Sequence, residues 1–141
     1  MNTEQAAELA QSFLDQMAQT ANAKDFAAHM GLISRDVTVL GIPGFDRIGY
    51  DDWASQCEHE FAQSILDNVR FGGLKILAAT DSRVMFKTTE TVTGTDGSVN
   101  ANAVEIMIVR ESDGIWRVAQ ERVLNPEEAA FDRARLDNTK K

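Results

Sequence analysis

Apolar residues recur at helical spacing near the start of the chain. On one face of a segment from about Thr3 to Thr20 lie the apolar side chains of Ala6, Leu9, Ala10, Phe13, Leu14 and Met17. Intervals of three and four residues are typical of an amphipathic helix. Asn22 can cap a second, shorter helix that ends at Gly31. The segment that begins at Asp51 and carries Trp53 on its apolar face predicts a third helix.

β-branched residues and turn formers dominate the rest of the chain. Val37–Ile42 is expected to form a short strand, and the turn-rich loop GIPGFDRIG leads on to the third helix. After Asn68, turn formers at 80–82, Asp96-Gly97 and Asp113-Gly114 separate β-branched segments, which predicts an antiparallel meander of four strands. Three helices followed by such a meander are typical of an α+β domain whose helices cover one face of the sheet.

Two tight turns would determine which side chains share a face of this meander. A two-residue turn at Asp113-Gly114 sets Glu105 opposite Arg122, and one at Asp96-Gly97 sets Thr88 opposite Glu105. The face under the helices is then expected to hold Val84, Phe86, Met107, Val109, Trp116 and Val118, with Thr88, Glu90, Glu105, Gln120 and Arg122. The other face is expected to hold Met85, Val104, Ile106, Ile108, Ala119 and Val123.

The polar side chains on the helix-covered face need partners or a cavity, because burying an unpaired polar group costs free energy. We therefore expect a pocket for a small molecule in this region. The apolar outer face would be larger than a monomer usually exposes. We expect a homodimer that forms through this outer sheet face.

Composition narrows the class of protein and its partners. The chain has 141 residues, 43% of them hydrophobic, which suits one domain with its own core. A net charge of −8 disfavours nucleic acid and anionic membrane surfaces. The first residues do not resemble a secretory signal, and no apolar run approaches the roughly 20 residues of a membrane span. Because Cys57 is the single cysteine, no intrachain disulfide and no Cys-rich zinc site can form, which suits a reducing compartment. We expect a cytoplasmic protein, and we expect neither a metal site nor a cofactor.

Three segments carry a resemblance to a known family. They are FLDQMAQTANAKDF in the first two helices, SRDVTVLGIPGFDRIGYDDW around the first strand, and VEIMIVRESDGIWRVAQERV in the last hairpin. Together they resemble the nuclear transport factor 2-like superfamily, in its SnoaL-like and ketosteroid isomerase-like branch, over about Thr3–Val123. The resemblance implies a cystatin-like cone, with three N-terminal helices packed on the concave face of a curved, mostly antiparallel sheet. It also implies an apolar ligand inside the cone.

The resemblance also implies domain boundaries. Residues 1–124 would form the nuclear transport factor 2-like domain. Residues 125–141 would add a short C-terminal helix and tail to the same domain, because Asn125 followed by Pro126 is typical of a helix start.

The catalytic residues of the family are only partly present. The position of the general-base aspartate of ketosteroid isomerases reads Gly41, and that of their oxyanion tyrosine falls near Met17. Glu105 lies close to the position of their second oxyanion acid. The strand histidines of the dehydratases are missing, since His29 and His59 both fall on predicted helices. The fold alone therefore does not define a reaction.

Glu105 and Arg122 are the strongest candidates for chemistry. A carboxylate beside a guanidinium in a sheltered cone could act as acid or base and as ligand anchor, and the alternative is a structural ion pair. His29 is a further catalytic candidate because histidine titrates near neutral pH, although a satisfied or surface histidine is the alternative. The residues expected to contact the ligand, or else to belong to the core, are Trp53, Phe86, Thr88, Glu90, Met107, Trp116 and Gln120.

Three functions stay open at this point. The first is a cofactor-independent isomerase, cyclase or dehydratase-type enzyme that acts on a small apolar carbonyl-type or polyketide-like compound. The second is a ligand carrier without catalysis. The third is a homodimeric assembly module whose cone is filled by its own side chains.

Overall fold

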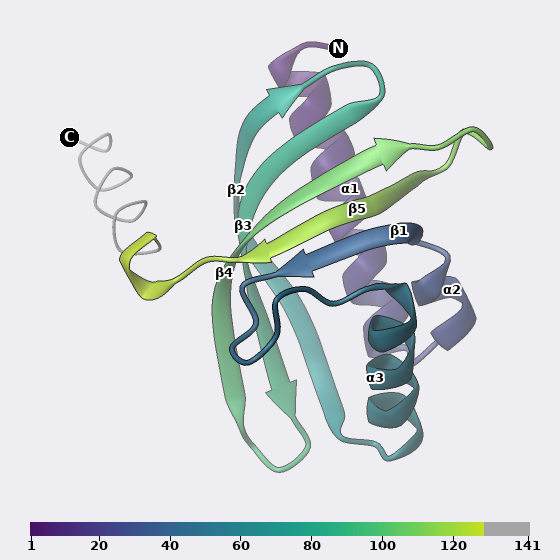
Figure 1. Cartoon of the computed structure of the whole chain (residues 1–141), viewed down its shortest axis with the longest axis vertical. Helices are drawn as coiled ribbons and strands as arrows, with labels where there is room; N and C mark the ends of the chain where they lie inside the picture. The colour runs from purple at the N-terminus through teal and green to yellow at the C-terminus, as the bar shows by residue number, and fades with distance from the viewer. Residues whose placement is uncertain (129–141) are drawn as a thin grey trace.

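The computed structural model describes residues 1–128. Its elements follow in the order α1 (Thr3–Asn22), α2 (Phe26–Met30), β1 (Ile33–Leu40), α3 (Tyr50–Ala62), β2 (Leu66–Ala79), β3 (Arg83–Gly94), β4 (Val99–Arg110) and β5 (Trp116–Val123). The strands form one sheet in the order β1-β5-β4-β3-β2, in which β1 runs parallel to β5 and all other pairs are antiparallel (Figure 1). The predicted α+β architecture is therefore confirmed.

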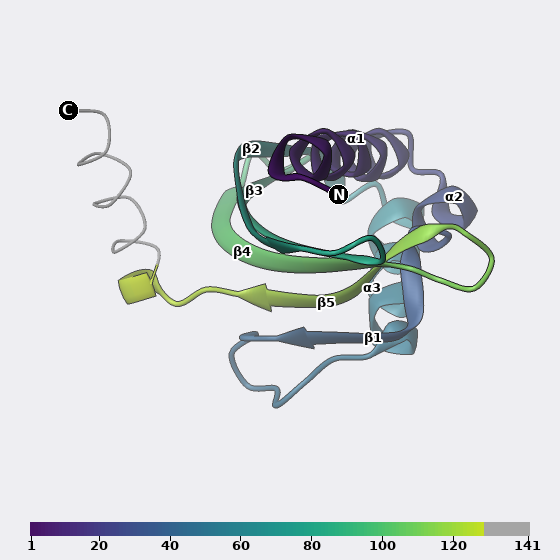
Figure 2. The same cartoon turned by 90° about the horizontal axis from the view of Figure 1, so that it is seen from above.

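The sheet curves around the first helix, and the hydrophobic core lies between them. In Figure 2, β2, β3 and β4 bend around α1, while α3 lies towards β1. The apolar stripe predicted for α1 is buried, with Leu14 only 1% exposed. Beneath it lie the buried side chains of Val84, Phe86, Val104, Ile106, Ile108 and Val118. This packing leaves the far end of the cone, between α3 and the sheet, outside the solid core.

Local hydrogen bonds set where the first helices begin. Asn2 accepts a hydrogen bond from the Gln5 N–H at 2.8 Å, and the Gln5 side chain accepts one from the Asn2 N–H at 2.9 Å, which is a capping box. Asp25, not Asn22, caps α2 by accepting from the Ala28 N–H. The Asn22 side chain instead bonds both the N–H and the carbonyl of Val69, and so fastens the end of α1 to β2.

The connection between β3 and β4 corrects the predicted pairing of these strands. Thr93 and Val99 are the last paired residues, and the five residues between them, 94–98, make the connection. Within it, the Gly94 N–H donates to the Ser98 carbonyl at 2.8 Å and the Asp96 side chain accepts from the Ser98 N–H. Phe86 consequently pairs with Ile106 and not with Met107. Because side chains alternate between faces, this shift of one residue moves Glu105 and Met107 to the opposite face from Phe86.

A bulge in β5 changes part of the predicted pairing between β4 and β5. The predicted pairs Glu105 with Arg122 and Met107 with Gln120 are confirmed. Beyond them the register shifts, so that Val118 pairs with Ile108 and not with Val109. One extra residue, Ala119, accounts for this shift and turns Val118 into the core.

The two corrections change the composition of the outer face. The residues Val104, Ile106 and Ile108, which we expected there, are at most 1% exposed and belong to the core. The outer face instead carries half-buried side chains of mixed character, namely Met85, Lys87, Glu105, Met107, Gln120 and Arg122. It is less apolar than the sequence indicated, and the homodimer through this face stays a prediction.

The described part of the chain ends in the first turn of the predicted C-terminal helix. Asn125 accepts a hydrogen bond from the Glu128 N–H at 2.8 Å, as a capping residue does. The remainder of that predicted helix and tail, 129–141, lies outside the described residues. Among residues 1–128, no helix combines the length and apolar character needed to cross a membrane.

Candidate functional site

A cavity of about 700 Å³ lies at the end of the cone where α3 faces the sheet. Its walls come from α1, α2, α3, the loop 41–49 and the strands β1, β2, β3 and β5. The lining is largely apolar and includes Val39, Ile42, Ile48, Trp53, Phe61, Leu66, Val69, Phe71 and Val92. A cavity of this size and character can hold a small organic molecule.

The loop 41–49 closes one side of the cavity and depends on a glycine. Gly41 has a φ of +85°, and a side chain there would collide with the carbonyl oxygen of Val123. Val39 and Ile48 pair across the base of the loop with N–H to carbonyl distances of 2.8 and 2.9 Å. Between them Phe45 lines the cavity, although its side chain is 63% exposed. The loop is therefore held at both ends while its middle borders solvent.

Two glutamates on the sheet supply the acidic groups of the cavity. Glu90 comes from β3 and Glu121 from β5, and Glu121 is only 9% exposed. Neither carboxyl group has a hydrogen bond or ion pair with any other residue among 1–128. Burial, together with the negative charge of Glu90, raises the pKa of Glu121 to about 8. Burial and then the charge of Glu60 raise the pKa of Glu90 as well. Glu121 is therefore protonated at neutral pH.

His29 on α2 is a third titratable group at the cavity. The side chain is 6% exposed, and its Nδ1 lies 2.8 Å from the hydroxyl oxygen of Thr20 on α1. Its ring meets that of Phe61 edge to face, with 6.0 Å between the ring centroids. Burial lowers the pKa of His29, against the opposing effect of a hydrogen bond to the Met17 backbone. The imidazole is therefore neutral at physiological pH and able to accept a proton.

Cys57 lines the same cavity but is no nucleophile. Burial, with the charge of Glu60 next, raises the pKa of the Cys57 thiol to about 12. The thiolate is the reactive form of cysteine, and it is not populated near neutral pH. Cys57 therefore acts as a small apolar wall residue.

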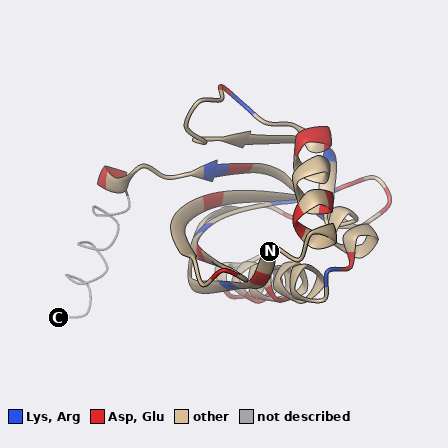
Figure 3. Cartoon of the chain, turned by 90° about the horizontal axis from the view of Figure 1, so that it is seen from below, with Lys and Arg blue, Asp and Glu red and all other residues tan. Residues whose placement is uncertain are grey.

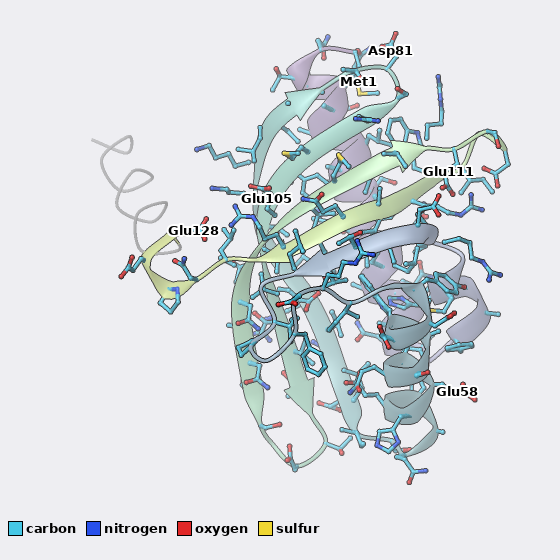
Figure 4. The ribbon with its side chains drawn as sticks, viewed as in Figure 1. Met1, Glu58, Asp81, Glu105, Glu111 and Glu128 are labelled. Atoms are coloured by element: carbon cyan, nitrogen blue, oxygen red, sulfur yellow. The ribbon has the colours of Figure 1, made fainter. Side chains whose placement is uncertain are left out.

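Glu105 and Arg122 lie close together, but outside the cavity. Arg122 Nη2 is 3.2 Å from Glu105 Oε2, and Arg122 Nη1 is 2.9 Å from Glu128 Oε2. Figure 4 shows Glu105 and Glu128 on the same side of the molecule, away from α3. Our placement of this pair on the pocket face was wrong, because it assumed a two-residue turn where residues 94–98 form a longer loop. The geometry fits the structural ion pair that was the alternative.

The other predicted ligand contacts divide into three groups. Trp53 and Glu90 line the cavity, as does His29. Phe86 and Thr88 are on the concave face but belong to the packed part of the cone, where the Thr88 hydroxyl donates to the Gly72 carbonyl at 3.2 Å.

The third group does not reach the cavity. Met107 and Gln120 face outward as a consequence of the same register shift. Trp116 packs against the core at the opposite end of β5.

The sequence reasoning missed Glu60 and Glu121. Glu60 had a usable signal, because it follows Trp53 by seven residues and Cys57 by three, which is the spacing of one helical face. Glu121 had none, because it lies between Gln120 and Arg122 and the pairing alone decides which of these faces inward. Figure 3 shows acidic positions on α3 and on the neighbouring strand. Among residues 1–128, no three His, Cys, Asp or Glu side chains are grouped so that they could hold a metal ion.

Comparisons with known structures identify the fold. An NTF2-like protein from Cytophaga hutchinsonii ATCC 33406 is similar at a TM-score of 0.70 and 13% identity, covering 87% of this chain and 98% of that one. ActVI-ORFA from Streptomyces coelicolor is similar at 0.63 and 16% identity, with 84% and 95% covered. A protein from Novosphingobium aromaticivorans DSM 12444, provisionally named a scytalone dehydratase, is similar at 0.64 and 13% identity, with 85% and 82% covered.

These likenesses show a nuclear transport factor 2-like fold, as the sequence indicated. No protein-family model and no curated protein matches the sequence. Identities this low define the fold alone, so any function has to be argued from the cavity and its side chains.

Proposed function

We propose that this protein binds a small, largely apolar molecule in the cavity and transfers protons on it, as a cofactor-independent isomerase, cyclase or dehydratase-type enzyme does. One observation carries this proposal. Two carboxyl groups without ion-pair partners, Glu90 and Glu121, lie in the wall of an otherwise apolar cavity of about 700 Å³. Like charges that share such a site cannot both ionise easily, so the pair retains a proton.

The pair thus contains one acid and one base. Glu121 is protonated at neutral pH and can donate to a carbonyl oxygen, since burial raises its pKa to about 8. When Glu90 is the ionised member of the pair, it can accept a proton from the carbon next to that carbonyl, which forms an enol. In an isomerisation, Glu90 returns its proton to a different carbon and the enol hydroxyl returns its proton to Glu121. In a dehydration, Glu90 gives its proton to a neighbouring hydroxyl group, which leaves as water, while the enol hydroxyl returns its proton to Glu121. His29 is a second acceptor at the same cavity.

The comparisons support the class of reaction without defining it. One similar structure carries the name of a dehydratase, which belongs to the reaction types that general acids and bases accomplish. The assembly-module alternative expects a cone filled by side chains, so the cavity favours ligand binding over it. A carrier would use the same cavity, and it differs from an enzyme by the absence of turnover.

A ligand screen with two matched variants tests the proposal. Small ketones, enones and aromatic polyketide mimics are screened by thermal shift, and those that raise the Tm are assayed for turnover by NMR. Glu121→Gln keeps the size of the side chain but cannot exchange a proton, so turnover should fall about 100-fold to 10,000-fold while binding persists. Glu105→Gln, on the outer face, is the control and should leave turnover unchanged.

Two results would contradict the proposal. Binding without turnover in the wild type would make the protein a carrier. Turnover that drops equally in Glu105→Gln and Glu121→Gln would move the chemistry to the outer face, where the sequence first placed it.

A further inference from the structure

The charged side chains around the cavity all have the same sign. Asp52, Glu60, Glu90 and Glu121 line it, and none of its lining residues, all within 1–128, is Lys or Arg. Most buried carboxylates in proteins are paired with a cation, because an isolated charge in an apolar environment is costly. Glu90 and Glu121 have no such partner in this part of the chain, and Glu60 accepts only a hydrogen bond from Gln56 at 2.8 Å.

Three of these carboxyl groups converge from different elements. Glu60 projects from α3, Glu90 from β3 and Glu121 from β5. They are close enough to interact, because the charge of Glu60 raises the pKa of Glu90 and that of Glu90 raises the pKa of Glu121. The concentration of like charge has no compensating group within the described protein. A bound cation would supply it.

Aromatic rings accompany the carboxyl groups. Trp53 and Phe61 from α3 and Phe71 from β2 line the same cavity. The negative faces of aromatic rings attract ammonium groups, and they also pack well against the apolar part of a ligand. An aromatic wall with several carboxylates suits an organic cation and disfavours an organic anion.

We infer that the ligand of this cavity carries a protonated nitrogen, which lies between Glu60 and Glu90, and an apolar body that packs against the aromatic wall. The inference rests on the proposed function, because it takes the cavity as the ligand site. It adds the charge class of the substrate.

Three probes that share one carbon frame test the charge class. 3-Phenylpropylamine is a cation at pH 7, 3-phenylpropanol is neutral and 3-phenylpropanoate is an anion. Binding is measured by titration calorimetry at low ionic strength. The amine should bind at least about tenfold more tightly than the alcohol, which corresponds to about 1.4 kcal/mol, and the acid should not bind.

Variants that remove one carboxylate at a time locate the cation. Glu60→Gln and Glu90→Gln should each weaken amine binding about tenfold and leave alcohol binding unchanged. Glu58→Gln is the matched control, because Glu58 is an exposed carboxylate on the same helix α3 (Figure 4). A general effect of net charge would weaken amine binding in all three variants, and this result would overturn the inference.

Proton release provides an independent readout. The titratable groups at the cavity are His29, Asp52, Cys57, Glu60, Glu90 and Glu121. Of these, Glu121 is protonated below about pH 8, and a bound cation favours its ionised form. Amine binding at pH 7 should therefore release protons, seen as a dependence of the heat on the buffer's ionisation enthalpy. Glu121→Gln should reduce this release, because it removes one of the two cavity carboxyl groups whose pKa is raised.

The outcomes separate this inference from the proposed function. Equal binding of alcohol and amine overturns the inference and leaves the proposed function standing. Binding of the acid overturns it as well. If none of the three probes binds, the inference fails, and the separate screen of neutral carbonyl compounds decides whether the cavity binds ligands at all.

Discussion

Two groups of acidic side chains on opposite sides of the sheet behave in opposite ways. On the outer face, Arg122 lies between Glu105 and Glu128, and this arrangement lowers the pKa of Glu128. On the inner face, the adjacent residue Glu121 meets Glu90 without any cation, and its pKa rises to about 8. Glu121 and Arg122 are neighbours in sequence, but their environments differ. The Arg122 side chain reaches solvent and groups of opposite charge, while the Glu121 side chain enters an apolar cavity. The unpaired group, not the ion pair, is the one suited to chemistry.

The largest expected effect concerns Glu121 and the way in which the free energy of unfolding depends on pH. The carboxyl of Glu121 ionises near its ordinary pKa of 4.5 when the chain is unfolded, and near 8 in the folded state. Between these values the folded state binds an extra proton, so stability is present below pH 4.5 and is lost as pH rises through 8. Glu121→Gln should remove this loss, on the order of a few kcal/mol, in urea unfolding at pH 8.5 compared with pH 5.

An outer-face variant sharpens this result. Glu105→Gln should show the same pH dependence of unfolding as the wild type over this range, because Glu121 remains in place. If both variants flatten the dependence equally, the raised pKa does not belong to Glu121. That result would mean that the carboxyl groups on the two faces contribute equally to the pH dependence of unfolding.

A smaller effect is expected when the charge of Glu90, at the same cavity, is removed. Glu90→Gln removes the like charge but leaves the burial, which is the larger cause of the raised pKa. The pKa of Glu121 should therefore fall but stay above its ordinary value. An NMR titration of the Glu121 side-chain carbon measures this directly. A pKa that returns fully to the ordinary value would show that charge, and not burial, dominates the site.

The smallest effect is expected on the outer face. Arg122→Ala breaks both contacts of the guanidinium, whose side chain is 31% exposed. Partly solvated ion pairs contribute little, so the free energy of unfolding should change by less than about 1 kcal/mol, and by still less at high salt. Ligand binding in the cavity should not change. A large loss of binding in Arg122→Ala would show that the outer face takes part in function.

Much of the fold could be predicted from local patterns. The buried stripe of α1 and the cap at Asn125 depend on residues close together in sequence. The two-residue turn predicted at Asp113-Gly114 was wrong, because Arg110 pairs with Trp116 and residues 111–115 lie between them. Glu105 still pairs with Arg122, because the bulge at Ala119 shifts the register back by one residue. Of the residues predicted for the site, His29, Trp53 and Glu90 line the cavity. Their signals were helical spacing and alternation along a strand, which need no knowledge of distant elements.

The sequence by itself determined the elements, their order and the kind of fold, because spacing, capping and turn formers act over a few residues. Only the tertiary structure decided that Glu121 and not Arg122 faces the cavity. The reason is that side chains alternate between the two faces of a strand. The loop 94–98 and the bulge at Ala119 each shift the pairing by one residue, and each shift reverses which side chains of the following or preceding strand segment face the cavity. The proposed function depends on which of these two adjacent side chains faces the cavity.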